Sequence, residues 1–167
     1  AGAGYDNLDL EACSARGIVA MNTPGQNSNA VAELAIAMMI FMSRNQFTPG
    51  TGMEVKGKKV GIQAYGNVGR LVAEKAKALG MEVMAFDPFV PAEKMVEEGV
   101  IPAESLEQMY EQCNFVSLHI PAIPATIGSI NYNLISRMPK GGCVVNTARK
   151  EVINEPELVK VLEDRPD

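Results

Sequence analysis

The chain has 167 residues, 47% of them hydrophobic and 21% charged, a composition typical of one globular domain. Its formal net charge is −5 and it contains no basic tract, which argues against nucleic acid as a partner, because duplex binding needs a cationic surface. The most apolar run, residues 34–42, is too short to cross a bilayer, so no membrane partner is expected.

The first part of the chain predicts a strand and a long apolar helix. Residues 17–21 are a short run rich in β-branched side chains, ended by the turn sequence of residues 22–25, and predict a strand. A helix is expected over residues 27–44, and its apolar side chains occupy almost every face. That pattern indicates burial all round or burial against a second subunit. Residues 45–57 contain several Gly and Pro residues and predict a connector.

From residue 58 onward, predicted strands alternate with predicted helices. The strands are expected at residues 59–63, 82–86, 115–118 and 143–146. The helices are expected at residues 67–79, 104–112 and 131–138, with a last helix beginning at Asn154, where Glu157 completes a capping box. This alternation with short loops predicts an α/β fold with a doubly wound parallel sheet.

A glycine loop follows the first strand of this series. Gly66 and Gly69 occupy the second and third glycine positions of the GxGxxG pattern that binds dinucleotides, and Ala64 occupies the first. Gly66 would let a pyrophosphate approach, Gly69 would allow close helix–strand packing, and Asn67 and Val68 would donate backbone amides at a helix N-terminus. Ala64 suits the turn if its φ is negative. The pattern predicts a Rossmann NAD-binding domain, and a helix that merely begins with glycines is the alternative.

An acidic residue at the end of the next strand indicates the cofactor. Asp87 follows Gly69 by 18 positions, where a carboxylate would accept hydrogen bonds from both ribose hydroxyls of NAD. The same charge would repel the additional phosphate of NADP, so NAD is the expected cofactor. The alternative for Asp87 is a turn residue before Pro88.

Several segments, in order along nearly the whole chain, resemble the D-2-hydroxyacid dehydrogenase family. They are AGAGYDNLDL at 1–10, GIVAMNTPG at 17–25, NSNAVAE at 27–33, VSLHIP at 116–121 with Thr126, MPKG at 138–141 and VNTAR at 145–149. Ala64 and Lys150 depart from the family pattern, since glycine is usual at both positions. The resemblance implies that residues 1–24 end a substrate-binding lobe and form a hinge, and that residues 25–167 are an NAD-binding Rossmann domain, incomplete at its C-terminus.

The resemblance also implies an activity and the residues that serve it. The family transfers a hydride between C2 of a small 2-hydroxy acid and NAD, and 3-phosphoglycerate is the closest substrate match. Arg149 would bind the substrate carboxylate and polarise the carbonyl, because its planar fork binds carboxylates in two places. The substrate would also face the backbone amides of Ala3 and Gly4 and the side chain of Asn27. Further cofactor contacts are implied for His119, Pro121, Thr126, Thr147, Ala148 and Arg149.

The family's catalytic glutamate and histidine are expected beyond residue 167, so the chain is read as a piece of a longer protein that is not active alone. Other interpretations of single residues stay open. From position alone, a surface salt bridge is the favoured interpretation of Arg149, and Asn27 is equally suited to a helix cap. His119 could serve as a base in principle, because histidine titrates near neutrality.

Two other functions use a similar fold. A non-catalytic NAD-sensing or protein-binding module is the main alternative. A methyltransferase that binds S-adenosylmethionine also uses a glycine loop, but it needs an acidic residue directly before the glycines, where residues 61–63 are Gly-Ile-Gln.

Cysteine usage and the apolar helix bear on location and assembly. The sequence has three widely spaced cysteines, Cys13, Cys113 and Cys143, and no CxxC pair. This pattern predicts reduced thiols, and therefore a reducing compartment and a cytoplasmic location. No metal site is expected. The methionine-rich helix at residues 27–44, together with the family resemblance, implies a homodimer.

Overall fold

The computed structural model describes residues 2–167 and contains one five-stranded parallel sheet. The strand order is β3-β2-β1-β4-β5. The strands are β1 (Lys59–Gln63), β2 (Glu82–Phe86), β3 (Ile101–Pro102), β4 (Phe115–Leu118) and β5 (Cys143–Asn146). The chain runs outward from β1 to β3 and then returns to the other side of β1, so the order reverses between β1 and β4. The prediction of a doubly wound parallel sheet is confirmed.

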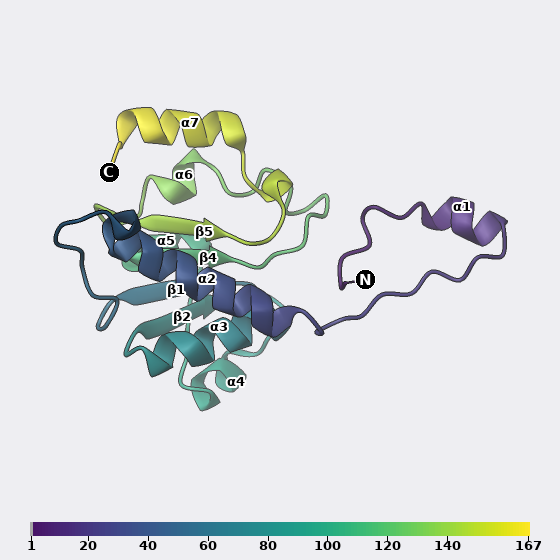
Figure 1. The fold of residues 1–167 in the computed structure, drawn as a ribbon, viewed down its shortest axis with the longest axis horizontal. Coiled ribbons are helices and arrows are strands. Elements are labelled where there is room, and N and C mark those ends of the chain that lie inside the picture. The colour runs from purple at the N-terminus through teal and green to yellow at the C-terminus, as the bar shows by residue number, and fades with distance from the viewer. Residues whose placement is uncertain (1) are drawn as a thin grey trace.

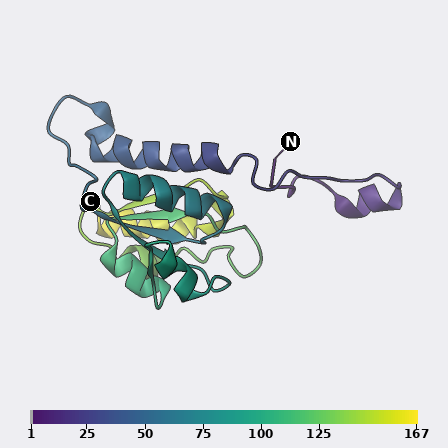
Figure 2. The ribbon, with the colours of Figure 1, turned by 90° about the horizontal axis from the view of Figure 1, so that it is seen from below.

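Helices cover both faces of this sheet (Figures 1 and 2). The helices are α1 (Leu10–Ala15), α2 (Ser28–Ser43), α3 (Asn67–Ala78), α4 (Ala92–Glu97), α5 (Leu106–Gln112), α6 (Tyr132–Ile135) and α7 (Glu155–Asp164), with 3-10 turns η1 (Asn45–Phe47) and η2 (Lys150–Val152). Helices α2 and α3 pack on one face, whereas α5, α6 and α7 contribute to the core on the other. Within residues 2–167, no helix has the length and apolar character needed to span a membrane.

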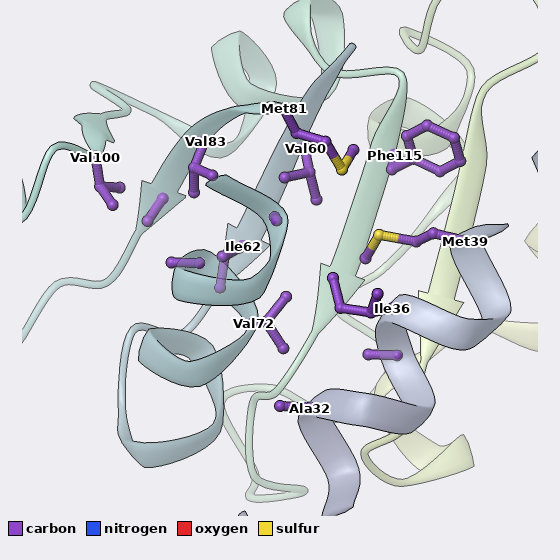
Figure 3. Close-up of a cluster of buried hydrophobic side chains, with 14 of the residues drawn as sticks. Ala32, Ile36, Met39, Val60, Ile62, Val72, Met81, Val83, Val100 and Phe115 are labelled. Atoms are coloured by element: carbon purple, nitrogen blue, oxygen red, sulfur yellow. The ribbon is translucent and has the colours of Figure 1, made fainter. Parts of the chain in front are cut away.

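The sheet separates two hydrophobic cores. On one side, Val60 and Ile62 of β1 pack against α2 and α3, as the close-up in Figure 3 shows. On the other side, Met109 and Tyr110 of α5 are fully buried. Burial on both faces is what a parallel sheet with crossover helices requires, and it holds the carboxyl ends of β1 and β4 in a rigid frame.

Residues 2–26, which include α1, extend away from this body as an arm (Figure 1). The predicted strand at residues 17–21 is wrong, because this segment has no strand neighbour among the described residues. Its side chains are largely in solvent: Val19 is 79% exposed and Met21 is 84% exposed. A β-branched run becomes a strand only where another chain segment takes up its backbone hydrogen bonds.

Other differences concern short elements. The sequence did not predict α1, α4 or β3, and α6 is shorter than the helix expected over residues 131–138. The last helix begins as predicted, because the side chain of Asn154 accepts a hydrogen bond from the amide of Glu157.

Candidate functional site

The glycine loop joins β1 to α3 and leaves an open position at the start of that helix. A Cβ added to Gly66, the N-cap residue of α3, would meet no atom within 4 Å. A Cβ on Gly69 would instead overlap the carbonyl oxygen of Ala64 and lie 3.0 Å from Cγ2 of Ile62. Gly66 therefore leaves room for a ligand, whereas Gly69 permits close helix–strand packing. The open space before the free amides of a 12-residue helix fits the pyrophosphate of NAD.

Ala64 adopts a backbone conformation that alanine disfavours. Its φ is +76°, so the expectation of a negative φ is wrong. The left-handed region costs an L-residue roughly 1–2 kcal/mol, because Cβ crowds the following carbonyl. The loop thus keeps the geometry of a glycine at its first position although alanine occupies it.

Asp87 ties the end of β2 to the glycine loop. Its Oδ2 accepts a hydrogen bond from the amide of Tyr65 at 2.8 Å, and its Oδ1 accepts one from the amide of Phe89 at 2.8 Å. The bond to Phe89 is the turn contact that was the alternative explanation for this residue. Each carboxylate oxygen has a second lone pair, so Asp87 retains acceptors for the hydroxyls of a ribose.

A cleft of about 530 Å³ lies where the arm meets the body, at the carboxyl ends of the strands. It brings together predicted substrate and cofactor residues from distant parts of the chain: Ala3, Gly4, Asn27, Val68, His119, Pro121, Thr147, Ala148 and Arg149. Ligands of doubly wound sheets bind at this edge. The predicted residues that do not line the cleft are Gly66, Asn67, Gly69, Asp87 and Thr126.

Arg149 makes a two-point ion pair inside this cleft. Its Nη2 lies 2.8 Å from Oδ1 of Asp6, and its Nε lies 3.2 Å from Oδ2. The hydrogen bond from Arg149 lowers the pKa of the Asp6 carboxyl below its usual range. The backbone approaches closely here, because a Cβ on Gly4 would lie 2.5 Å from Nη2. Arg149 therefore does form the salt bridge that was the alternative explanation for it. The salt bridge lies within the cleft. Nη1 of Arg149 has no hydrogen-bond partner among residues 2–167.

His119 is held between two hydroxyl groups. Its Nε2 lies 2.9 Å from Oγ of Ser117, and its Nδ1 lies 3.4 Å from Oγ1 of Thr147. Burial lowers the pKa of the imidazole to about 4. The ring is therefore neutral near pH 7 and a weak base, which disfavours the alternative of His119 as the catalytic base.

Two further predicted residues differ in how they meet the cleft. Asn27 is the N-cap residue of α2, but its side chain makes no capping bond, and the residue lines the cleft. Thr126 lies outside the lining: its hydroxyl donates to the carbonyl of Pro121 and accepts from the amide of Ile123, so it shapes the loop.

Sequence reasoning missed part of the cleft lining, namely Tyr5, Asp6, Val31, Ile120, Ala122 and Ile123. The signal for Asp6 was present, since it lies in the same glycine-rich segment as Ala3 and Gly4. Among residues 2–167, no group of three or more His, Cys, Asp or Glu side chains is placed to hold a metal ion.

Solved structures share this fold over nearly the whole chain. NAD+-bound 3-phosphoglycerate dehydrogenase of Entamoeba histolytica is 46% identical, with a TM-score of 0.88 over 99% of this chain and 52% of that chain. The apo form of D-lactate dehydrogenase from Escherichia coli is 28% identical, with a TM-score of 0.88 over 98% of this chain and 55% of that chain.

Curated proteins are also similar in sequence to this chain over nearly its whole length. The human protein D-3-phosphoglycerate dehydrogenase is 36% identical over 98% of this chain and 33% of its own length. The protein of the same name from Methanocaldococcus jannaschii is 33% identical over 98% of this chain and 34% of its own length. The chain thus spans about a third of the length of these two relatives.

The family model described as "D-isomer specific 2-hydroxyacid dehydrogenase, NAD binding domain" matches residues 29–166, which include every strand of the sheet. The glycine loop, Asp87 and the cleft all belong to, or adjoin, this matched segment. This chain therefore belongs to the D-2-hydroxyacid dehydrogenase family and carries its NAD-binding domain.

Proposed function

We propose that the chain is the cofactor half of an NAD-dependent D-2-hydroxyacid dehydrogenase whose substrate is 3-phosphoglycerate. The observation that carries this proposal is the shared cleft, which Arg149 and Gly4 line together with Val68 of α3. The names of the relatives support the choice of 3-phosphoglycerate.

Each half of the site has a proposed role. Gly66, Asn67 and Val68 hold the pyrophosphate at the start of α3, and Asp87 binds the ribose. Bound NAD supplies the hydride acceptor for oxidation at C2. His119, Pro121, Thr147 and Ala148 line the cleft around the cofactor, and Thr126 keeps the loop at Pro121 in shape.

On the substrate side, Arg149 binds the carboxylate and stabilises the developing carbonyl with its positive charge. The backbone amides of Ala3 and Gly4, with the side chain of Asn27, orient the acid. His119 is not assigned as the acceptor of the proton that leaves the hydroxyl, because burial lowers the pKa of its imidazole to about 4.

Cofactor binding is tested by titrating the chain with NADH and NADPH in a calorimeter. We expect NADH to bind at least tenfold more tightly, because the carboxylate of Asp87 repels a 2′-phosphate. Asp87→Asn should weaken NADH binding by roughly tenfold, as expected when a hydrogen bond to a charged group is lost. Glu163→Gln, an equal charge change at an exposed position of α7, is the control and should leave NADH binding unaltered. Equal affinities for NADH and NADPH would contradict the assigned role of Asp87.

We also propose that residues 1–24 belong to a substrate-binding lobe and hinge, and residues 25–167 to the NAD-binding domain. The extended arm supports this division, because its exposed apolar side chains suit packing against the rest of a lobe.

A cytoplasmic location is proposed as well, supported by Cys13, Cys113 and Cys143, which are all free thiols.

A homodimer through α2 is the proposed assembly. Leu34 is 54% exposed, and Met38, Phe41 and Met42 of the same helix are each at least 37% exposed. We expect a dimer in sedimentation velocity and a monomer for Leu34→Glu, because burying an unpaired charge at an interface is unfavourable. Val96→Glu, at a 60% exposed position of α4, should remain dimeric. A monomeric unaltered chain would refute this assembly.

A further inference from the structure

Tyr65 lies in the glycine loop, and both its backbone amide and its side-chain hydroxyl make hydrogen bonds. Its amide donates to Oδ2 of Asp87 at 2.8 Å, and its hydroxyl donates to Oε2 of Glu98 at 2.8 Å. The residue is only 2% exposed. Burial, followed by the hydrogen bond to Glu98, raises the pKa of Tyr65, so the hydroxyl keeps its proton and remains a donor. One residue of the loop thus connects the ribose-binding carboxylate to the end of α4.

Arg70, in the first turns of α3, contacts both Tyr65 and Glu98. Its guanidinium lies 4.7 Å from the centroid of the Tyr65 ring and forms an ion pair with Glu98. Glu98 is the C-cap residue of α4, and its pKa is lowered chiefly by the hydrogen bond from Tyr65. The three side chains therefore join the loop, α3 and α4, and none of them lines the cleft.

The hydrogen bonds of Tyr65 matter because Ala64, the preceding residue, has a strained backbone conformation. Its positive φ is unfavourable for alanine, so the loop would relax if Ala64 were free to return to a negative φ. Such a change would carry the amide of Tyr65 away from Asp87 and would alter the approach to Gly66. The bonds of the Tyr65 side chain oppose that relaxation.

We propose that Tyr65, held by Glu98 and Arg70, is a positioning residue that keeps the glycine loop in its NAD-binding form against the strain at Ala64. This inference rests on the proposed cofactor binding. The nicotinamide cofactor does not need to touch the Tyr65 side chain, because the effect passes through the backbone of residues 64–66.

The test is a double-mutant cycle on the full chain, with NADH affinity measured by calorimetry and stability measured by thermal unfolding. Tyr65→Phe should weaken NADH binding roughly tenfold, the factor expected when one hydrogen bond to a charged group is lost. In the background of Ala64→Gly, the same substitution should change NADH affinity less than twofold, because glycine adopts a positive φ without strain. Glu98→Gln should act in the same direction as Tyr65→Phe.

Tyr110→Phe is the matched control, because Tyr110 is also fully buried and donates to Oε1 of Gln63 at 3.1 Å on the opposite face. It should lower the melting temperature but leave NADH affinity unchanged. An equal loss of affinity with Ala or Gly at position 64 would overturn the inference, and so would normal NADH binding by Tyr65→Phe. No NADH binding by the unaltered chain would instead overturn the proposed function and this inference with it.

Discussion

Gly69→Ala is expected to lower the free energy of unfolding by about 3 kcal/mol or more, the upper range for overpacking a core. The added methyl group would overlap the carbonyl oxygen of Ala64 and press on Ile62. Neither neighbour can yield easily, because the carbonyl is backbone and Ile62 is fully buried in β1. Urea denaturation monitored by circular dichroism measures the loss.

Gly66→Ala is the natural comparison, three positions earlier in the same loop. The space around Gly66 is empty and its φ is −86°, so its stability should change by less than about 1 kcal/mol. It should nevertheless weaken NADH binding, because the methyl group enters the space assigned to the pyrophosphate. Equal stabilities of the two variants would contradict the assigned packing role of Gly69.

Arg149→Gln is expected to reduce kcat/KM for oxidation of 3-phosphoglycerate on the order of 1,000-fold, in the protein at its natural length. The substitution removes the charge that binds the carboxylate and stabilises the developing carbonyl. NADH affinity should change much less, so steady-state kinetics and a cofactor titration together separate the two effects.

Lys150→Gln provides the control for Arg149. It removes a neighbouring positive charge whose residue does not line the cleft, and kcat/KM should stay within about twofold of the unaltered protein. Asp6→Asn should give an intermediate loss, because it weakens the two-point contact that orients the guanidinium. Normal turnover by Arg149→Gln would exclude the proposed substrate role.

The βαβ unit around the glycine loop could be predicted because several local signals agreed. The boundaries of β1 and β2 match the expected ranges, since each is a short apolar run between turn residues. The strand expected at residues 17–21 failed for a nonlocal reason, because its backbone pairs with no strand among the described residues 2–167. Short elements such as β3 were missed because two residues carry almost no periodic pattern.

The candidate site could be predicted as a set of residues but not as a set of contacts. The family resemblance implied that Gly4 and Arg149 share one site, and both line the same cleft. The pairing of Arg149 with Asp6 joins residues 143 positions apart, a separation that no local pattern encodes. The positive φ of Ala64 was missed because backbone geometry follows from the packing of Gly69 against the loop, not from the residue type at position 64.

The ion pair between Arg149 and Asp6 also makes the arm responsive to ionic strength. Among residues 2–167, it supplies the hydrogen bonds that connect arm residues 2–24 to the body from Ser28 onward. Both side chains are about half exposed or more, so dissolved salt screens their attraction. A substrate carboxylate arriving at Arg149 would meet a guanidinium that Asp6 already orients, so both anions would share the same positive charge. The arm is therefore coupled electrostatically to whatever anion occupies the cleft.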